Sequence, residues 1–142
     1  MRPINWARVI LGGLLAGVVI NAFESVLNGV IFAEEMEAAM KALGRQVGGG
    51  QIAMFVVWGF LVGIFAVWLY AGIRPRYGAG PKTAALAGLA VWVLGYLLAA
   101  VTPIALDLFP LRLMVIGLAI GLVEVIVGTL LGAWLYREES AA

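Results

Sequence analysis

The sequence contains no cysteine and no histidine. Without cysteine there can be no disulfide, no iron–sulfur cluster, no thiolate zinc site and no cysteine nucleophile. Without histidine the chain lacks the commonest general base and metal ligand, and haem cannot be held through an imidazole. The sequence therefore predicts neither a metal site nor a cofactor.

Charged residues are also scarce. They make up 12% of the 142 residues, against roughly 25% in soluble domains, whereas 64% are hydrophobic, against roughly 45–50%. The formal net charge is +1 and no basic stripe exists, so binding of nucleic acid is not expected. Intrinsic disorder is excluded by the high hydrophobicity. This composition predicts an integral membrane protein, whose first partner is the lipid bilayer.

Four stretches have the length and apolar character of membrane-spanning helices, which need about 20 residues each. They cover residues 9–32, 52–73, 83–106 and 113–136. They do not alternate as the strands of a membrane barrel do. The first stretch could resemble a signal peptide, but its apolar character resumes after Glu24 and no clean cleavage site follows. The expected fold is all-α: one polytopic domain, a bundle of four transmembrane helices.

The distribution of lysine and arginine predicts the orientation of these spans. Six of the nine basic residues fall on the side of the two termini and of the loop at 74–82, namely Arg2, Arg8, Arg74, Arg76, Lys82 and Arg137. The other side holds Lys41, Arg45 and Arg112. Aromatic residues gather at the predicted inner boundary as interface anchors: Trp6, Trp68, Tyr70, Trp134 and Tyr136. We expect a multi-pass protein of the inner (cytoplasmic) membrane with both termini in the cytoplasm.

The longest connection lies between the first two spans. Its residues 34–43 place Met36, Met40 and Leu43 at helical spacing, with charged residues between them. This pattern predicts a short amphipathic helix on the outer surface, interpreted as a connector that covers one end of the bundle.

Two glutamates, Glu24 and Glu124, interrupt the apolar spans. A charged side chain at the membrane centre costs about 2.5–3.5 kcal/mol on insertion scales, and such groups normally face the protein interior. Each glutamate shares a helix face, about 80° wide, with small or polar residues. On the fourth span these are Gly117, Gly121, Gly128 and Gly132, and on the first span Gly13, Gly17, Asn21 and Asn28, with Ser25 at the border. Since glycine lets backbones approach closely, the two faces predict that spans one and four pack against each other.

Several states could neutralise the two carboxyls, because no basic residue lies in any predicted span. Burial and a like-charged neighbour favour the protonated form, and the two groups could share one proton. They could instead hold a cation with Asn21 and Asn28. They could also accept hydrogen bonds from Tyr96 and Trp92, whose polar tips near the centre of the third span need partners. Trp58, Phe60 and Phe65 are interpreted as packing or lipid-facing residues.

Three motifs resemble those of an uncharacterised family of small four-helix bacterial integral membrane proteins. They are the pattern Asn21-x-x-Glu24-x-x-x-Asn28, the loop from Arg74 to Thr83, and the run around Glu124 that ends at Gly132-Ala133-Trp134-Leu135-Tyr136. The resemblance covers most of the chain. It implies a fold and a membrane location, but no activity.

The candidate site is therefore a buried polar centre made of Glu24, Glu124, Asn21, Asn28, Ser25 and Tyr96, with no catalytic residue. The favoured function is non-enzymatic: binding or movement of a proton, a cation or a small solute. The alternative is an accessory or scaffold subunit, in which the centre only holds helices together. A homo-oligomer and a larger membrane complex both remain open. A third hypothesis, water activation by a carboxyl dyad in an intramembrane enzyme, is weaker because no loop motif accompanies the pair.

Overall fold

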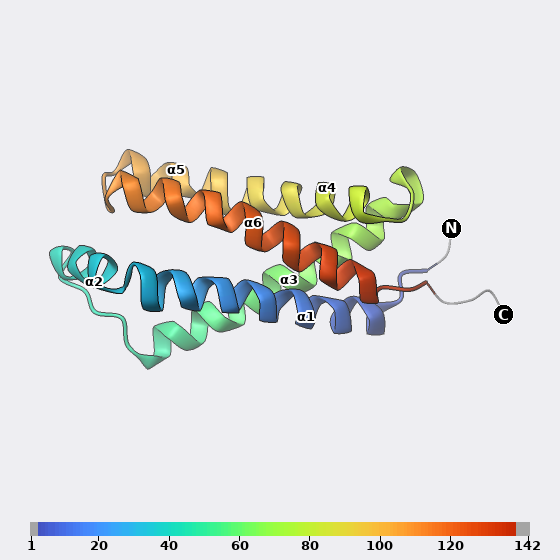
Figure 1. Cartoon of the computed structure of the whole chain (residues 1–142), viewed down its shortest axis with the longest axis horizontal. Coiled ribbons are helices and arrows are strands. Elements are labelled where there is room, and N and C mark those ends of the chain that lie inside the picture. The colour runs from blue at the N-terminus through green and yellow to red at the C-terminus, as the bar shows by residue number, and fades with distance from the viewer. Residues whose placement is uncertain (1–2, 139–142) are drawn as a thin grey trace.

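The computed structural model describes residues 3–138, which excludes Arg2 from the structural account. Within this range every regular element is helical. The elements are α1 (Trp6–Val26), the π-helical η1 (Leu27–Ile31), α2 (Ala33–Ala42), α3 (Gly49–Tyr77), α4 (Pro81–Trp92), the π-helical η2 (Val93–Leu97), α5 (Leu98–Ala105) and α6 (Leu111–Leu135) (Figure 1).

Four continuous helical segments of the described chain are long and apolar enough to cross a membrane. They are Trp6–Ile31, Gly49–Tyr77, Pro81–Ala105 and Leu111–Leu135. Their number and positions agree with the four predicted spans, and together they suggest a multi-pass membrane protein. The beginning of α1 and the end of α6 lie at one end of the molecule, whereas α2 lies at the opposite end (Figure 1).

The boundary between α3 and α4 differs from the sequence prediction. We expected the helix to end near residue 73, but α3 continues through Pro75 to Tyr77 and ends where Gly78 takes a φ of 85°. Pro75 has no backbone N–H, so it cannot make the helical hydrogen bond to the carbonyl four residues earlier, and α3 ends two residues after it. The next helix begins at Pro81, whose fixed φ suits the first helical position, with Gly80 as its cap. Thr83, in the first turn of α4, donates a hydrogen bond to the Tyr77 carbonyl.

Helix α1 packs against both α3 and α6, and α4 packs against α6 and α3. The predicted contact between the first and fourth spans is present at Gly128 and Gly132. A Cβ added at Gly132 would lie 2.6 Å from the Gly12 carbonyl oxygen, and one at Gly128 would lie 3.1 Å from that of Ala16. Close backbone approach therefore joins α1 to α6 in the half of the molecule that contains the termini.

The other predicted glycines have different neighbours. Gly13 and Gly17 face α3, where they meet Ile64 and Phe60, and a Cβ at Gly63 would lie 2.5 Å from the Gly13 carbonyl oxygen. Gly117 has no heavy atom within 4 Å of the position of a Cβ, so it makes no helix contact. The prediction that the small-residue faces of spans one and four lie against each other is therefore wrong for these positions. The small residues of α1 contact two neighbouring helices, α3 and α6.

Helix α2 has no buried residue, in keeping with the predicted surface helix. Its acidic residues occupy the first turn and Lys41 the last, which suits the helix dipole. Arg112, at the start of α6, contacts both oxygens of Glu35 at 2.8 and 2.9 Å, and its guanidinium lies 5.7 Å from the Phe32 ring centroid. These contacts hold α2 beside the start of α6.

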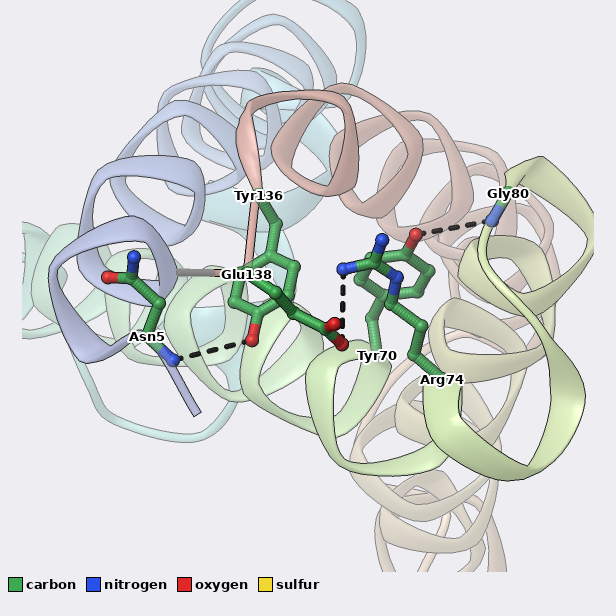
Figure 2. Close-up of polar contacts among 6 residues, drawn as sticks. All are labelled: Asn5, Tyr70, Arg74, Gly80, Tyr136 and Glu138. Atoms are coloured by element: carbon green, nitrogen blue, oxygen red, sulfur yellow. Dashed lines mark hydrogen bonds and ion pairs between the residues drawn. The ribbon is translucent and has the colours of Figure 1, made fainter. Parts of the chain in front are cut away.

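The opposite end of the molecule holds a cluster of polar and aromatic residues, the Arg74 cluster: Asn5, Tyr70, Arg74, Gly80, Tyr136 and Glu138 (Figure 2). The rings of Tyr70 and Tyr136 lie perpendicular to each other with centroids 6.0 Å apart, and the Arg74 guanidinium lies 5.6 Å from the Tyr136 centroid. Arg74 also pairs with Glu138 at 3.3 Å, and the Tyr70 hydroxyl accepts a hydrogen bond from the Gly80 amide. Tyr70 and Tyr136, expected as interface anchors, are therefore buried, whereas Trp6 and Trp134 are exposed.

Candidate functional site

Glu124 lies near the middle of α6 and is completely buried, with an exposed fraction of 0%. Its Oε1 accepts a hydrogen bond of 2.8 Å from the Tyr96 hydroxyl. Its Oε2 has no hydrogen-bond partner among the described residues. A buried carboxyl oxygen without a partner is costly, so this atom marks the place where a proton or a ligand is needed.

One turn before Glu124, Gly121 makes room for Tyr96. A Cβ at position 121 would lie 2.7 Å from Cδ1 of the Tyr96 ring. Because Gly121 has no side chain, the Tyr96 ring can approach α6 closely enough for its hydroxyl to reach Glu124. Gly121 thus positions the Tyr96 hydrogen bond, whereas the sequence analysis assigned it to contact between helices one and four.

Glu24 of α1 is the second acidic residue near Glu124 and Tyr96. It is partly buried, and its Oε2 accepts a hydrogen bond of 2.6 Å from Nδ2 of Asn28, one turn later. The Glu24 carboxyl lies near both Glu124 and Tyr96, although Oε2 of Glu124 has no hydrogen-bond partner within residues 3–138. The structure thus brings the two acidic residues into one neighbourhood.

Both residues that bond to the carboxyls come from π-helical turns. Asn28 lies in η1 and Tyr96 lies in η2. Single π turns inside α-helices are rare and occur often at functional sites, because the wider turn redirects side chains. Here the two π turns belong to helices on opposite sides of the carboxyl pair.

A cleft of about 570 Å³ leads from the α2 end of the molecule to this centre. Its polar lining consists of Glu24, Asn28 and Tyr96. The rest is aliphatic, aromatic or thioether, contributed by Leu27, Phe32, Met36, Met54, Phe55, Trp58, Ala100, Phe109, Leu113, Met114, Gly117 and Leu118. The volume falls in the usual range of small-molecule sites, about 300–1,000 Å³. A small set of polar groups at the inner end of an apolar cleft is typical of a binding site.

Two features of the cleft were missed by sequence analysis. Trp58 lines it, with its ring centroid 5.4 Å from that of Tyr96, although the sequence indicated only packing or lipid contact. Gly117 widens it, since no atom fills the space beside it. The only signal in the sequence was the helical spacing that places Gly117 and Gly121 on the face of Glu124.

The structure does not bring every predicted residue to the centre. Asn21 turns towards α3, donating hydrogen bonds to the carbonyls of Gly17 and Val56, and fills the space beside Gly59. Ser25 is exposed. Trp92 donates to the Leu118 carbonyl rather than to a carboxyl. The centre therefore comprises Glu24, Asn28, Tyr96 and Glu124.

Comparison of the chain with protein-family models, curated proteins and solved structures finds no match. The family resemblance drawn from the sequence motifs remains an expectation, and function is argued from the site alone.

Proposed function

We propose that this chain is a non-enzymatic membrane protein whose Glu24–Glu124 pair binds, or moves, a proton, a cation or a small solute. The observation that carries the proposal is the fully buried Glu124 carboxyl, which has one oxygen without a hydrogen-bond partner among the described residues, near Glu24, which lines a cleft. The two carboxyls need compensation that the described residues do not provide.

The proposal depends on charge that the described residues near Glu124 do not compensate. The titratable neighbours of Glu124 are Glu24 and Tyr96, and neither carries a positive charge. Two ionised carboxyls in apolar surroundings repel each other and are poorly solvated. One shared proton would supply Oε2 of Glu124 with a partner and leave a single negative charge on the pair. That remaining charge is what an exchangeable cation, or a second proton, would neutralise.

The cleft and the Arg74 cluster lie towards opposite ends of the molecule. The Arg74 cluster lies at the end that contains the termini, whereas the cleft reaches the centre from the α2 end (Figure 2). We place the termini in the cytoplasm, in an inner membrane, because the positive residues gather there. Access in this conformation would then be from the outer side.

The alternative is an accessory or scaffold subunit. It is favoured by the Tyr96–Glu124 hydrogen bond, which joins η2 to α6 and which a permanently neutral glutamate would also accept. Either function is compatible with a homo-oligomer or a larger complex.

Infrared difference spectroscopy across pH, on protein in nanodiscs, separates the two functions. The variants Glu24→Gln and Glu124→Gln assign the carboxyl bands, since glutamine keeps the hydrogen-bonding shape but cannot titrate. Glu37→Gln on the exposed face of α2 is the matched control. A carboxyl band that titrates, and that disappears in one of the two site variants, supports the binding function. If both groups stay protonated at every pH, the centre is structural and the scaffold function stands.

A further inference from the structure

The cleft has a composition that restricts its ligand. Its inner end is anionic and hydrogen-bonding, whereas its walls are apolar and include the rings of Phe55, Trp58 and Phe109. A ligand that satisfies both parts must carry positive charge at one end and apolar surface along the rest. A neutral apolar ligand would leave the Glu24 carboxyl, the acidic group that lines the cleft, without a compensating charge.

Aromatic rings lie where the charge of such a ligand would be. Trp58 and Tyr96 are in contact, with centroids 5.4 Å apart, and both line the cleft beside Glu24. Ring faces attract cations, and they favour quaternary or alkylated ammonium groups, whose charge is spread over methyl groups and is weakly hydrated. The rings and the carboxyl thus select the same kind of charge.

A metal ion fits less well. Calcium takes six to eight oxygen ligands, and magnesium prefers an octahedral shell with several waters. The described residues include no group of three or more acidic, histidine or cysteine side chains that could hold a metal. The apolar walls also offer nothing to a hydrated ion.

We propose that the cleft binds an organic monocation, an ammonium with an alkyl or aryl body, with its charge against Glu24 and its body along the Trp58 wall. This inference deepens the proposed function and rests on it. A carboxyl pair that holds one proton carries one negative charge, which one such cation neutralises. The cleft of about 570 Å³ accommodates a body of one or two rings.

The test uses three probes and the full chain in nanodiscs of neutral phosphatidylcholine. Benzyltrimethylammonium carries both charge and an aryl body. Neopentylbenzene has the same shape without the charge, and tetramethylammonium has the charge without the body. Equilibrium dialysis measures binding, with empty nanodiscs subtracted. We expect saturable binding of benzyltrimethylammonium, about tenfold weaker binding of tetramethylammonium, and no saturable binding of neopentylbenzene.

Matched variants locate the site. Glu24→Gln should weaken benzyltrimethylammonium binding at least about tenfold, whereas Glu37→Gln should leave it unchanged. Trp58→Leu should weaken it about fivefold, whereas Trp134→Leu, at an exposed ring distant from the cleft, should not. Gly117→Leu fills the cleft without altering charge and should abolish binding, with Gly72→Leu as its control at another open glycine. The Gly117 variant keeps the test decisive if a glutamate variant fails to fold.

Other outcomes overturn the proposal. Equal binding of the cationic and neutral probes would mean that the cleft is an apolar surface for lipid chains. Binding that survives both Glu24→Gln and Gly117→Leu would place the cation elsewhere. If the carboxyls titrate in the infrared experiment but no probe binds, the organic ligand is wrong while the proposed function stands. If the carboxyls never titrate and no probe binds, both fail.

Discussion

The Tyr96 hydroxyl and Oε1 of Glu124 are joined by a hydrogen bond of 2.8 Å that links two helices at the most deeply buried acidic group of the described chain. The other oxygen of the same carboxyl has no partner. Among the described residues, the protein therefore provides a partner for one oxygen of Glu124 and none for the other.

Replacing Tyr96 with phenylalanine removes the donor and leaves both oxygens of Glu124 unsatisfied. The free energy of unfolding should fall by about 1–2 kcal/mol, because interhelical hydrogen bonds in membranes contribute modestly. Denaturation in mixed micelles measures this change. The infrared band of the Glu124 carboxyl should also shift in the variant, since a hydrogen bond to Oε1 is lost.

Tyr77→Phe is the control for this substitution. Tyr77 is 59% exposed, so losing its hydroxyl should change neither stability nor the carboxyl band. An unaltered Glu124 band in Tyr96→Phe would contradict the hydrogen bond itself.

Gly63→Ala should destabilise the contact between α1 and α3. The added methyl would lie 2.5 Å from the backbone oxygen of Gly13 and the backbone nitrogen of Gly17, and neither atom can move without separating the helices. Overpacking of this kind typically costs about 1–3 kcal/mol of unfolding free energy. Gly72→Ala, on the same helix with open space around it, should change stability by less than about 1 kcal/mol, in the stabilising direction. Unfolding titrations of the two variants should therefore diverge, and equal stability would disprove the close crossing.

Arg74→Gln should loosen the end of the molecule that contains the termini. The substitution removes the ion pair with Glu138 and the stacking on Tyr136, both partly shielded from solvent, and should lower stability by about 1–2 kcal/mol. Arg76→Gln removes the same charge from the last turn of the same helix at an exposed position, so any effect on membrane topology is common to both variants. Hydrogen exchange at Tyr136 and the start of α4 should increase in Arg74→Gln alone.

Glu35→Gln at the opposite end should behave differently. The Arg112–Glu35 pair is exposed, with side-chain exposed fractions of 65% and 45%, so its contribution to global stability should be below about 1 kcal/mol and should vanish at high salt. Amide exchange in α2 should nevertheless rise, because this pair holds α2 beside α6. Glu34→Gln, in the same turn of α2, is the control. If amide exchange in α2 rises equally in Glu34→Gln and Glu35→Gln, the Arg112–Glu35 pair does not hold α2 beside α6.

The four spans could be predicted from sequence because length and hydrophobicity alone determine whether a segment can cross a bilayer. Which helix faces contact each other could not be predicted from the sequence. Spacing places Gly13, Gly17 and Asn21 on one side of α1, but it does not say which neighbour that side meets, and the structure turns these residues to α3 while Glu24 reaches α6.

Local geometry explains the remaining differences. The π turns η1 and η2 shift the register of Asn28 and Tyr96 away from the regular helical arc assumed in the sequence analysis. Tyr70 and Tyr136 have the composition of interface anchors, yet a nearby arginine and backbone amides supply partners that bury them. Such partners come from distant segments and leave no periodic signal.

The length of α3 has a consequence for how the molecule would respond to its surroundings. Its 29 residues extend about 43 Å, and its uncharged apolar part, residues 52–73, extends about 33 Å, slightly more than the hydrocarbon core of a bilayer at about 30 Å. Such a stretch is accommodated by a small tilt that changes with membrane thickness. Because Met54, Phe55 and Trp58 of α3 form one wall of the cleft, a change in bilayer thickness that tilts α3 would also move that wall.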